Sequence, residues 1–137
     1  MSEFNMSNHF NVDDYPFQEE CYIVIGIAME IHRILGKGFS EIVYKDAFEY
    51  ELTSRGIGYE REKRFVVNYK GIVLKHQFYA DFVIDNKIIL EIKSSNGIVD
   101  AYYAQVLNYL TISKLKVGLI INFNDKSLQY KRIIKTK

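Results

Sequence analysis

Residues 79–93 read YADFVIDNKIILEIK, which is the most informative segment of the chain. Residues 85–87, Asp-Asn-Lys, form a loop of a common hairpin length between two extended segments. Counting outward from that loop places Asp81 opposite Glu91. The sequence therefore predicts an antiparallel hairpin with two carboxylates on directly facing residues.

The two faces of this predicted hairpin differ in chemistry because side chains alternate along a strand. One face is wholly apolar and consists of Ala80, Phe82, Ile84, Ile88, Leu90 and Ile92. The other face carries Tyr79, Asp81, Val83, Ile89, Glu91 and Lys93. Like charges placed directly opposite each other destabilise a strand pair, and a cation between the carboxylates would remove that cost.

Such paired acids suit a hard divalent cation. Carboxylate oxygens, a backbone carbonyl and water are the ligands that Mg²⁺ takes in proteins. Lys93 shares the acidic face, where it could offset charge, hold a phosphate or orient an attacking water. The alternative is a solvated edge hairpin in which Lys93 neutralises Glu91, and both interpretations stay open at this point.

The rest of the chain supplies helices and further strands around this hairpin. Three-to-four spacing of apolar residues predicts helices, and period-two spacing predicts strands. The predicted helices cover 17–35, about 40–55 and 99 to about 113. The predicted strands cover about 59–69 with a further extended residue at 73, and then 77–84, 88–93, 117–123 and 128–134. This order indicates the α/β (α+β) class, with a central mixed β-sheet flanked by helices.

Length and composition narrow the class of protein. Among 137 residues we expect a flexible N-terminal arm over 1–16 and a single domain over 17–137. Lys plus Arg is 18 and Asp plus Glu is 17. This balance argues against a protein that binds polyanions through a strongly charged tail. The one cysteine, Cys21, excludes an internal disulfide and a cysteine-built metal site. No targeting or membrane signal is found, so we expect a cytoplasmic protein without membrane contact.

Three motifs, in this order along the chain, resemble one family. They are Gly38 to Tyr44, which reads G-x-x-E-x-x-Y, Asp81 with Glu91-Ile92-Lys93, and Gln105 to Tyr109, which reads Q-x-x-x-Y. The middle motif is similar to the signature of the PD-(D/E)xK nuclease superfamily, although Ala80 stands at the proline-like position. The last resembles the extra motif of its helicase-associated exonuclease branch. Together, over roughly residues 20–134, the set resembles the bacterial GxxExxY family.

The resemblance implies a restriction-endonuclease-like core and a metal site. Asp81 and Glu91 would hold Mg²⁺ or Mn²⁺, with the carbonyl of Ile92 as a third ligand. Glu41, on the second predicted helix, would be the acid that completes the metal shell. Lys93 would be the catalytic lysine.

Residues on the predicted helices keep two interpretations each. Glu41 is either that metal ligand or a first-turn acid favoured by the helix dipole, while Tyr44 either is structural or supports a residue of the site. Gln105 and Tyr109 lie four residues apart and share a helix face. Gln105 would contact a phosphate, the lysine or a metal-bound water, and Tyr109 would stack or hydrogen-bond at the site. Otherwise the pair is a solvated glutamine beside a half-buried tyrosine.

The predicted function is metal-dependent hydrolysis of phosphodiester bonds in nucleic acid, with DNA placed ahead of RNA as the partner. The alternative is a non-catalytic nucleic-acid- or protein-binding module on the same fold. Basic residues cluster at 61–64 and near the C-terminus, where they could track a phosphate backbone. A domain this small has no separate target-recognition part, so holding a duplex could require a homodimer or a protein partner.

Overall fold

The computed structural model describes residues 15–135, so residues 1–14 of the expected N-terminal arm lie outside the described residues. The elements are α1 (Gln18–Leu35), α2 (Glu41–Ser54), β1 (Tyr59–Tyr69), β2 (Ile72–Ile84), β3 (Ile88–Lys93), α3 (Asp100–Ser113), β4 (Val117–Asn122) and β5 (Gln129–Ile134). The predicted segments at 73 and 77–84 form one strand, β2, because both pair with β1. None of the described helices has the length and apolar character needed to span a membrane.

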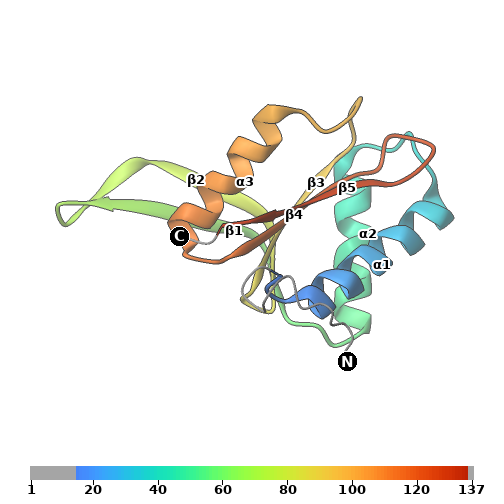
Figure 1. Cartoon of the computed structure of the whole chain (residues 1–137), viewed down its shortest axis with the longest axis horizontal. Coiled ribbons are helices and arrows are strands. Elements are labelled where there is room, and N and C mark those ends of the chain that lie inside the picture. The colour runs from blue at the N-terminus through green and yellow to red at the C-terminus, as the bar shows by residue number, and fades with distance from the viewer. Residues whose placement is uncertain (1–14, 136–137) are drawn as a thin grey trace.

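The five strands form one mixed sheet in the order β1-β2-β3-β4-β5. Neighbouring strands are antiparallel except β3 and β4, which are parallel. A parallel pair needs a crossover connection, and α3 supplies it. Helices α1 and α2 cover one face of the sheet, and α3 covers the other (Figure 1). The predicted α/β (α+β) class and the flanked mixed sheet are therefore confirmed.

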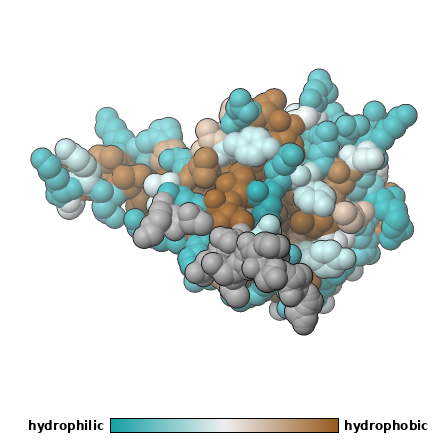
Figure 2. Space-filling view, viewed as in Figure 1, coloured by the Kyte–Doolittle hydropathy of each residue, from teal (hydrophilic) through white to brown (hydrophobic). Residues whose placement is uncertain are grey.

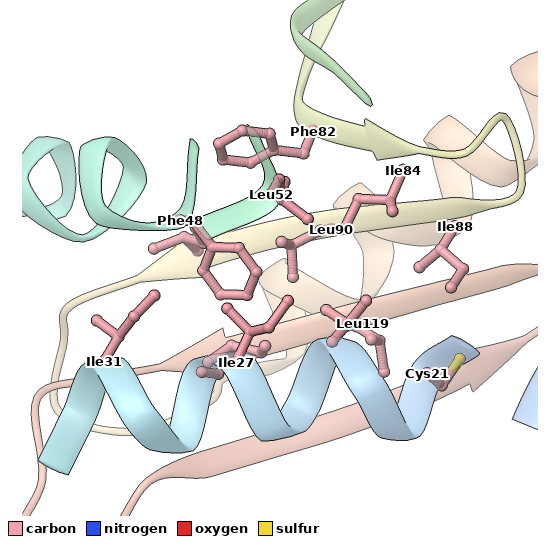
Figure 3. Packing of buried hydrophobic residues seen from close by; sticks show 14 of the residues in the cluster. Cys21, Ile27, Ile31, Phe48, Leu52, Phe82, Ile84, Ile88, Leu90 and Leu119 are labelled. Atoms are coloured by element: carbon pink, nitrogen blue, oxygen red, sulfur yellow. The ribbon is translucent and has the colours of Figure 1, made fainter. Parts of the chain in front are cut away.

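The larger core lies between the sheet and the two N-terminal helices (Figure 3). Ile27 of α1 and Phe48 of α2 are fully buried against Phe82 and Leu90 of the sheet. Burying each such side chain contributes about 1.5–3 kcal/mol, so this face anchors the hairpin. The apolar hairpin face predicted from sequence packs here, with the exception of Ala80, which belongs to the cluster under α3.

The smaller core lies between α3 and the opposite face of the sheet. Val83 and Ile89 pack there with Val106 and Leu110 of the helix. A Cβ atom at Gly118 of β4 would overlap the Val106 side chain, so glycine permits the close approach of α3. This approach sets the position of the α3 side chains relative to the ends of β2 and β3.

The outer part of the β1–β2 hairpin extends well beyond the other strands (Figure 1). We call residues 64–79 the projecting hairpin. Its turn is Lys70-Gly71, and both residues have positive φ, 51° and 79°. The strand register shifts between Val66 and Asn68, so the projecting hairpin is irregular along its length. Residues 72–77 of β2 are exposed, since only β1 pairs with them.

Candidate active site

The predicted register of the β2–β3 hairpin is confirmed next to its loop. Ile84 pairs with Ile88, and the ladder continues inward to the pair Phe82 and Leu90. The predicted direct pairing of Asp81 with Glu91 is wrong, because regular pairing stops one residue earlier. The strands part at this point, and the two acids meet in a different way.

Each acid accepts a hydrogen bond from the backbone of the opposite strand. The N–H of Asp81 donates to Glu91 Oε2 at 2.8 Å. The N–H of Ile92 donates to Asp81 Oδ2, also at 2.8 Å. Both acids are buried, with exposures of 7% for Asp81 and 2% for Glu91. Because the ladder is open here, backbone N–H groups can donate to the two carboxylates. In a regular ladder the two carboxylates would face and repel each other.

β1 is also irregular next to this point. Glu62 has a φ of 53°, in the left-handed region that strands avoid. Pairing between the strands is interrupted there, since Arg61 pairs with Phe82 and Lys63 with Ala80. Ala80 packs under α3 and so lies away from the face predicted from strict alternation.

Lys45 of α2 is a site residue that the sequence reasoning missed. Its Nζ lies 2.8 Å from Asp81 Oδ1 and 3.3 Å from Glu62 Oε2. Burial opposes the charge of Lys45, but the hydrogen bond and charge of Asp81 outweigh it and raise the pKa of the lysine. The available signal was spacing, because Lys45 follows Glu41 by one helical turn and shares its face.

Glu91 is the most perturbed acid of the site. Burial, reinforced by the negative charge of Asp81, raises the pKa of Glu91 to about 8. The hydrogen bond from the Asp81 backbone and the charges of Lys93 and Lys45 counteract this rise only in part. Near neutral pH Glu91 therefore tends to keep its proton, and added positive charge would favour its release.

Lys93 contacts side chains of α3. Its Nζ donates to Gln105 Oε1 at 3.1 Å and lies 4.4 Å from the ring centre of Tyr102. Gln105 Nε2 donates to the Tyr109 hydroxyl at 3.1 Å, and that hydroxyl donates to the carbonyl of Tyr79 at 2.9 Å. Of the partners considered for Gln105, the lysine is the one present. Tyr109 is buried as part of this chain of hydrogen bonds, and burial raises its pKa to about 12.

Tyr44 holds the loop that precedes Glu41. The tyrosine is fully buried and stacks on Phe123 with ring centres 4.3 Å apart. Its hydroxyl donates to the carbonyl of Gly36 at 2.6 Å and accepts from the N–H of Phe39. The structural interpretation of Tyr44 is thus confirmed, and its role is to fix the entry of α2.

The donor chemistry at the acid pair fits a hard divalent cation. Two carboxylates are held together by backbone hydrogen bonds, and the ammonium group of Lys45 already contacts one of them. Within residues 15–135, no three His, Cys, Asp or Glu side chains cluster in a way that could hold a metal ion. Glu41 therefore does not complete a three-acid shell in this structure. Its role and that of the Ile92 carbonyl stay predictions.

The family of the chain follows from a comparison with known families. The sequence model of the PD-(D/E)XK nuclease superfamily matches residues 18–133 of the chain. The chain belongs to the PD-(D/E)XK nuclease superfamily. The match spans every strand of the sheet except the last residue of β5, and it includes Asp81, Glu91 and Lys93. No curated protein matches the chain.

Two solved structures show the fold of this PD-(D/E)XK chain in other proteins. The crystal structure of SSO0001 has a TM-score of 0.58 and 22% identity, and the match covers 69% of this chain and 50% of that one. The chain thus spans half the length of SSO0001. The alkaline exonuclease LHK-Exo from Laribacter hongkongensis has a TM-score of 0.51 and 11% identity, with coverage of 88% and 71%. The restriction-endonuclease-like core implied by the sequence motifs is therefore confirmed.

Proposed function

We propose that the chain is a metal-dependent nuclease that hydrolyses phosphodiester bonds. The single observation that carries this proposal is the pair Asp81 and Glu91, buried side by side at the open end of the hairpin with Lys93 two residues away. Two acids and a lysine on adjacent strand ends are the groups that bind a divalent cation and neutralise phosphate charge. Superfamily membership supports the same chemistry.

The residues would divide the work between metal and phosphate. Asp81, Glu91 and the carbonyl of Ile92 would hold Mg²⁺ or Mn²⁺. A bound divalent cation supplies Lewis-acid stabilisation of phosphate oxygens and lowers the pKa of a water ligand. Lys93 would hold the attacking water or a phosphate oxygen, and Gln105 would orient its ammonium group. Tyr109 would keep Gln105 in place by its hydrogen bonds to Gln105 and to the Tyr79 carbonyl.

The test is a cleavage assay that includes isosteric variants. Plasmid, linear and single-stranded DNA and RNA are incubated with Mg²⁺, Mn²⁺ or EDTA. We expect metal-dependent cleavage by the native chain and none by Asp81→Asn or Lys93→Gln. Asp85→Asn is the matched control because Asp85 is exposed in the hairpin loop at φ 52°, a conformation that asparagine accepts.

Two results would overturn the proposal. One is the absence of cleavage of every substrate by a folded native chain. The other is equal cleavage by the native chain and both site variants, which would identify a contaminating nuclease. Thermal unfolding of each variant establishes that it is folded before its activity is compared.

We further propose that the chain is of the GxxExxY type. In support, Tyr44 is buried and fixes the Gly36–Phe39 loop, which gives the final tyrosine of the motif a structural function. The same anchoring places Glu41 at the first turn of α2, one turn before Lys45. In this proposal the motif serves to position the α2 face against the acid pair.

The ion pair between Lys45 and Asp81 favours a second candidate, a non-catalytic nucleic-acid-binding module. The ammonium group of Lys45 already supplies a positive charge to one Asp81 oxygen, at 2.8 Å. Titration calorimetry with Mn²⁺ separates the two candidates. Heat that disappears in Asp81→Asn supports the nuclease, whereas no heat together with salt-sensitive binding of nucleic acid supports the module.

A further inference from the structure

The projecting hairpin carries charge of one sign. Residues 64–79 include Arg64, Lys70 and Lys75 and no acidic residue, although the whole chain has a net charge of only +1. All three side chains are exposed. Exposed cations without neighbouring acids attract a polyanion even where the total charge of a protein is near zero.

A groove lies between the base of the projecting hairpin and α3. It has a volume of about 760 Å³ and includes Gln77 and Tyr79 from β2, Lys93 from β3, and Tyr102 and Asn108 from α3. None of the described residues that line it is acidic. Because Lys93 belongs both to this groove and to the candidate active site, a chain lying in the groove would reach the acid pair.

Exposed tyrosine rings occur at the base and near the tip of the projecting hairpin. Tyr79 is 48% exposed, and its hydroxyl is held by Gln77 at 3.0 Å. Tyr69, near the tip, is 55% exposed and has Lys70 Nζ 5.5 Å from its ring centre. Aromatic faces beside cations are what proteins use to stack the bases of a single strand while neutralising its phosphates.

The tip of the hairpin favours a single strand over a duplex. Ile72, Val73 and Leu74 are exposed there, at 62%, 55% and 41%. Hydrophobic residues lie between hydrophilic ones along the projection in Figure 2. A β-ribbon that reads a duplex groove uses polar side chains against base edges, whereas unpaired bases offer apolar faces to such residues.

We propose that the groove between the projecting hairpin and α3 binds a single strand of nucleic acid, and that the projecting hairpin extends this binding surface away from the active site. The proposal rests on the proposed function and names the form of its substrate. Tyr79 stacks a base at the edge of β2 that borders the groove, and Lys70 and Lys75 contact phosphates farther out. DNA and RNA single strands share this chemistry, and the experiment includes both.

The test measures binding by the full chain in EDTA, where metal-dependent cleavage cannot occur. Fluorescence anisotropy is recorded with a labelled oligothymidylate, a labelled oligouridylate and a labelled duplex of equal length. We expect Tyr79→Ala to weaken single-strand binding about tenfold, and Tyr79→Phe to retain it because the ring is kept. Tyr50→Ala is the matched control, since Tyr50 is 70% exposed on α2.

The charge contribution has its own readout. The double variant Lys70→Gln, Lys75→Gln should reduce the slope of log affinity against log salt by about 1.4, or about 0.7 for each phosphate that a lysine no longer neutralises. The control double variant Lys37→Gln, Lys126→Gln removes two exposed lysines outside the projecting hairpin and should leave the slope unchanged.

Three outcomes would overturn the inference, and each is distinct from failure of the proposed function. They are tighter binding of the duplex than of either single strand, unchanged binding by Tyr79→Ala, and an unchanged salt slope in the Lys70, Lys75 variant. If metal-dependent cleavage persists in those cases, the nuclease proposal stands and only the assigned binding surface is wrong. If binding depends on the projecting hairpin as expected but no cleavage occurs, the assigned binding surface stands and the nuclease proposal is wrong.

Discussion

The inner and outer halves of β2 share a strand conformation but have opposite environments. Residues 80–84 are buried, and 82–84 pair with both β1 and β3, whereas 72–77 are exposed and pair with β1 alone. Asp81 lies where the two halves meet. The inner half is fixed by packing, the outer half is left accessible to a partner, and the acid pair lies at the boundary where strand pairing opens.

The largest effect should come from the inner half. Phe82 is fully buried against Phe48 and Tyr59, so Phe82→Ala should lower the free energy of unfolding by about 3–5 kcal/mol. Val73→Ala in the outer half should change it by less than about 0.5 kcal/mol. Urea denaturation measures both. Comparable losses would contradict the division of β2 into a packed and an accessible half.

The next effect concerns the boundary itself. Lys45→Met should cost about 3 kcal/mol, because it leaves the buried Asp81 carboxylate without its cation. The double variant with Asp81→Asn should recover part of this loss, since the uncompensated charge is then absent. A double-mutant cycle measured by urea denaturation gives the coupling free energy between Lys45 and Asp81. Additive losses would mean that Lys45 stabilises α2 by packing alone.

The pH dependence of the free energy of unfolding should report the ionisation of Glu91. Its pKa in the folded chain is about 8, above the usual value of 4.5, so the folded state holds this proton more tightly. The resulting stability is fully present below pH 4.5 and is lost as pH rises through 8. The native chain should therefore lose on the order of 2 kcal/mol more than Glu91→Gln between pH 5 and 8.

Urea denaturation of the native chain and Glu91→Gln across that range makes this comparison without metal. Parallel profiles for the two proteins would show that Glu91 does not titrate abnormally. Added Mn²⁺ should reverse the trend for the native chain alone, because a cation at the acid pair favours the ionised carboxylate.

The smallest effect concerns the hydrogen bonds that link α3 to β2. Tyr109→Phe removes the bond to the Tyr79 carbonyl and should cost about 1 kcal/mol. Tyr50→Phe is the control, because Tyr50 is 70% exposed and should show no measurable change. Thermal unfolding suffices for this pair. An equal change in both would show that the Tyr109 hydroxyl contributes nothing specific.

The part of the fold that depends on local pattern could be predicted from the sequence. The loop at residues 85–87 sets the register as far as Phe82 and Leu90, and alternation then assigns most of the apolar face. The opening at Asp81 could not be predicted in this way. It lies beside the left-handed backbone of Glu62, a residue from another strand with no local motif for that conformation.

The candidate site divides in the same manner. Asp81, Glu91 and Lys93 follow from strand spacing, and the shared face of Gln105 and Tyr109 follows from helical spacing. Lys45 does not, because its contact with Asp81 depends on how α2 packs against the hairpin. Local patterns in a single sequence do not indicate how elements that are distant in the sequence pack together.

The order of strands in the sheet is the same as their order in the chain, and this has a consequence for folding. Three of the four strand neighbours are joined by hairpin or loop connections and can form early, because closing a short loop costs little entropy. The β3–β4 pair must wait for α3 to cross over. The acids Asp81 and Glu91 should therefore come together in an early hairpin, while Lys93 gains Gln105 only when the crossover docks. Synthesis of the chain thus assembles the candidate metal ligands before the residue that orients the lysine.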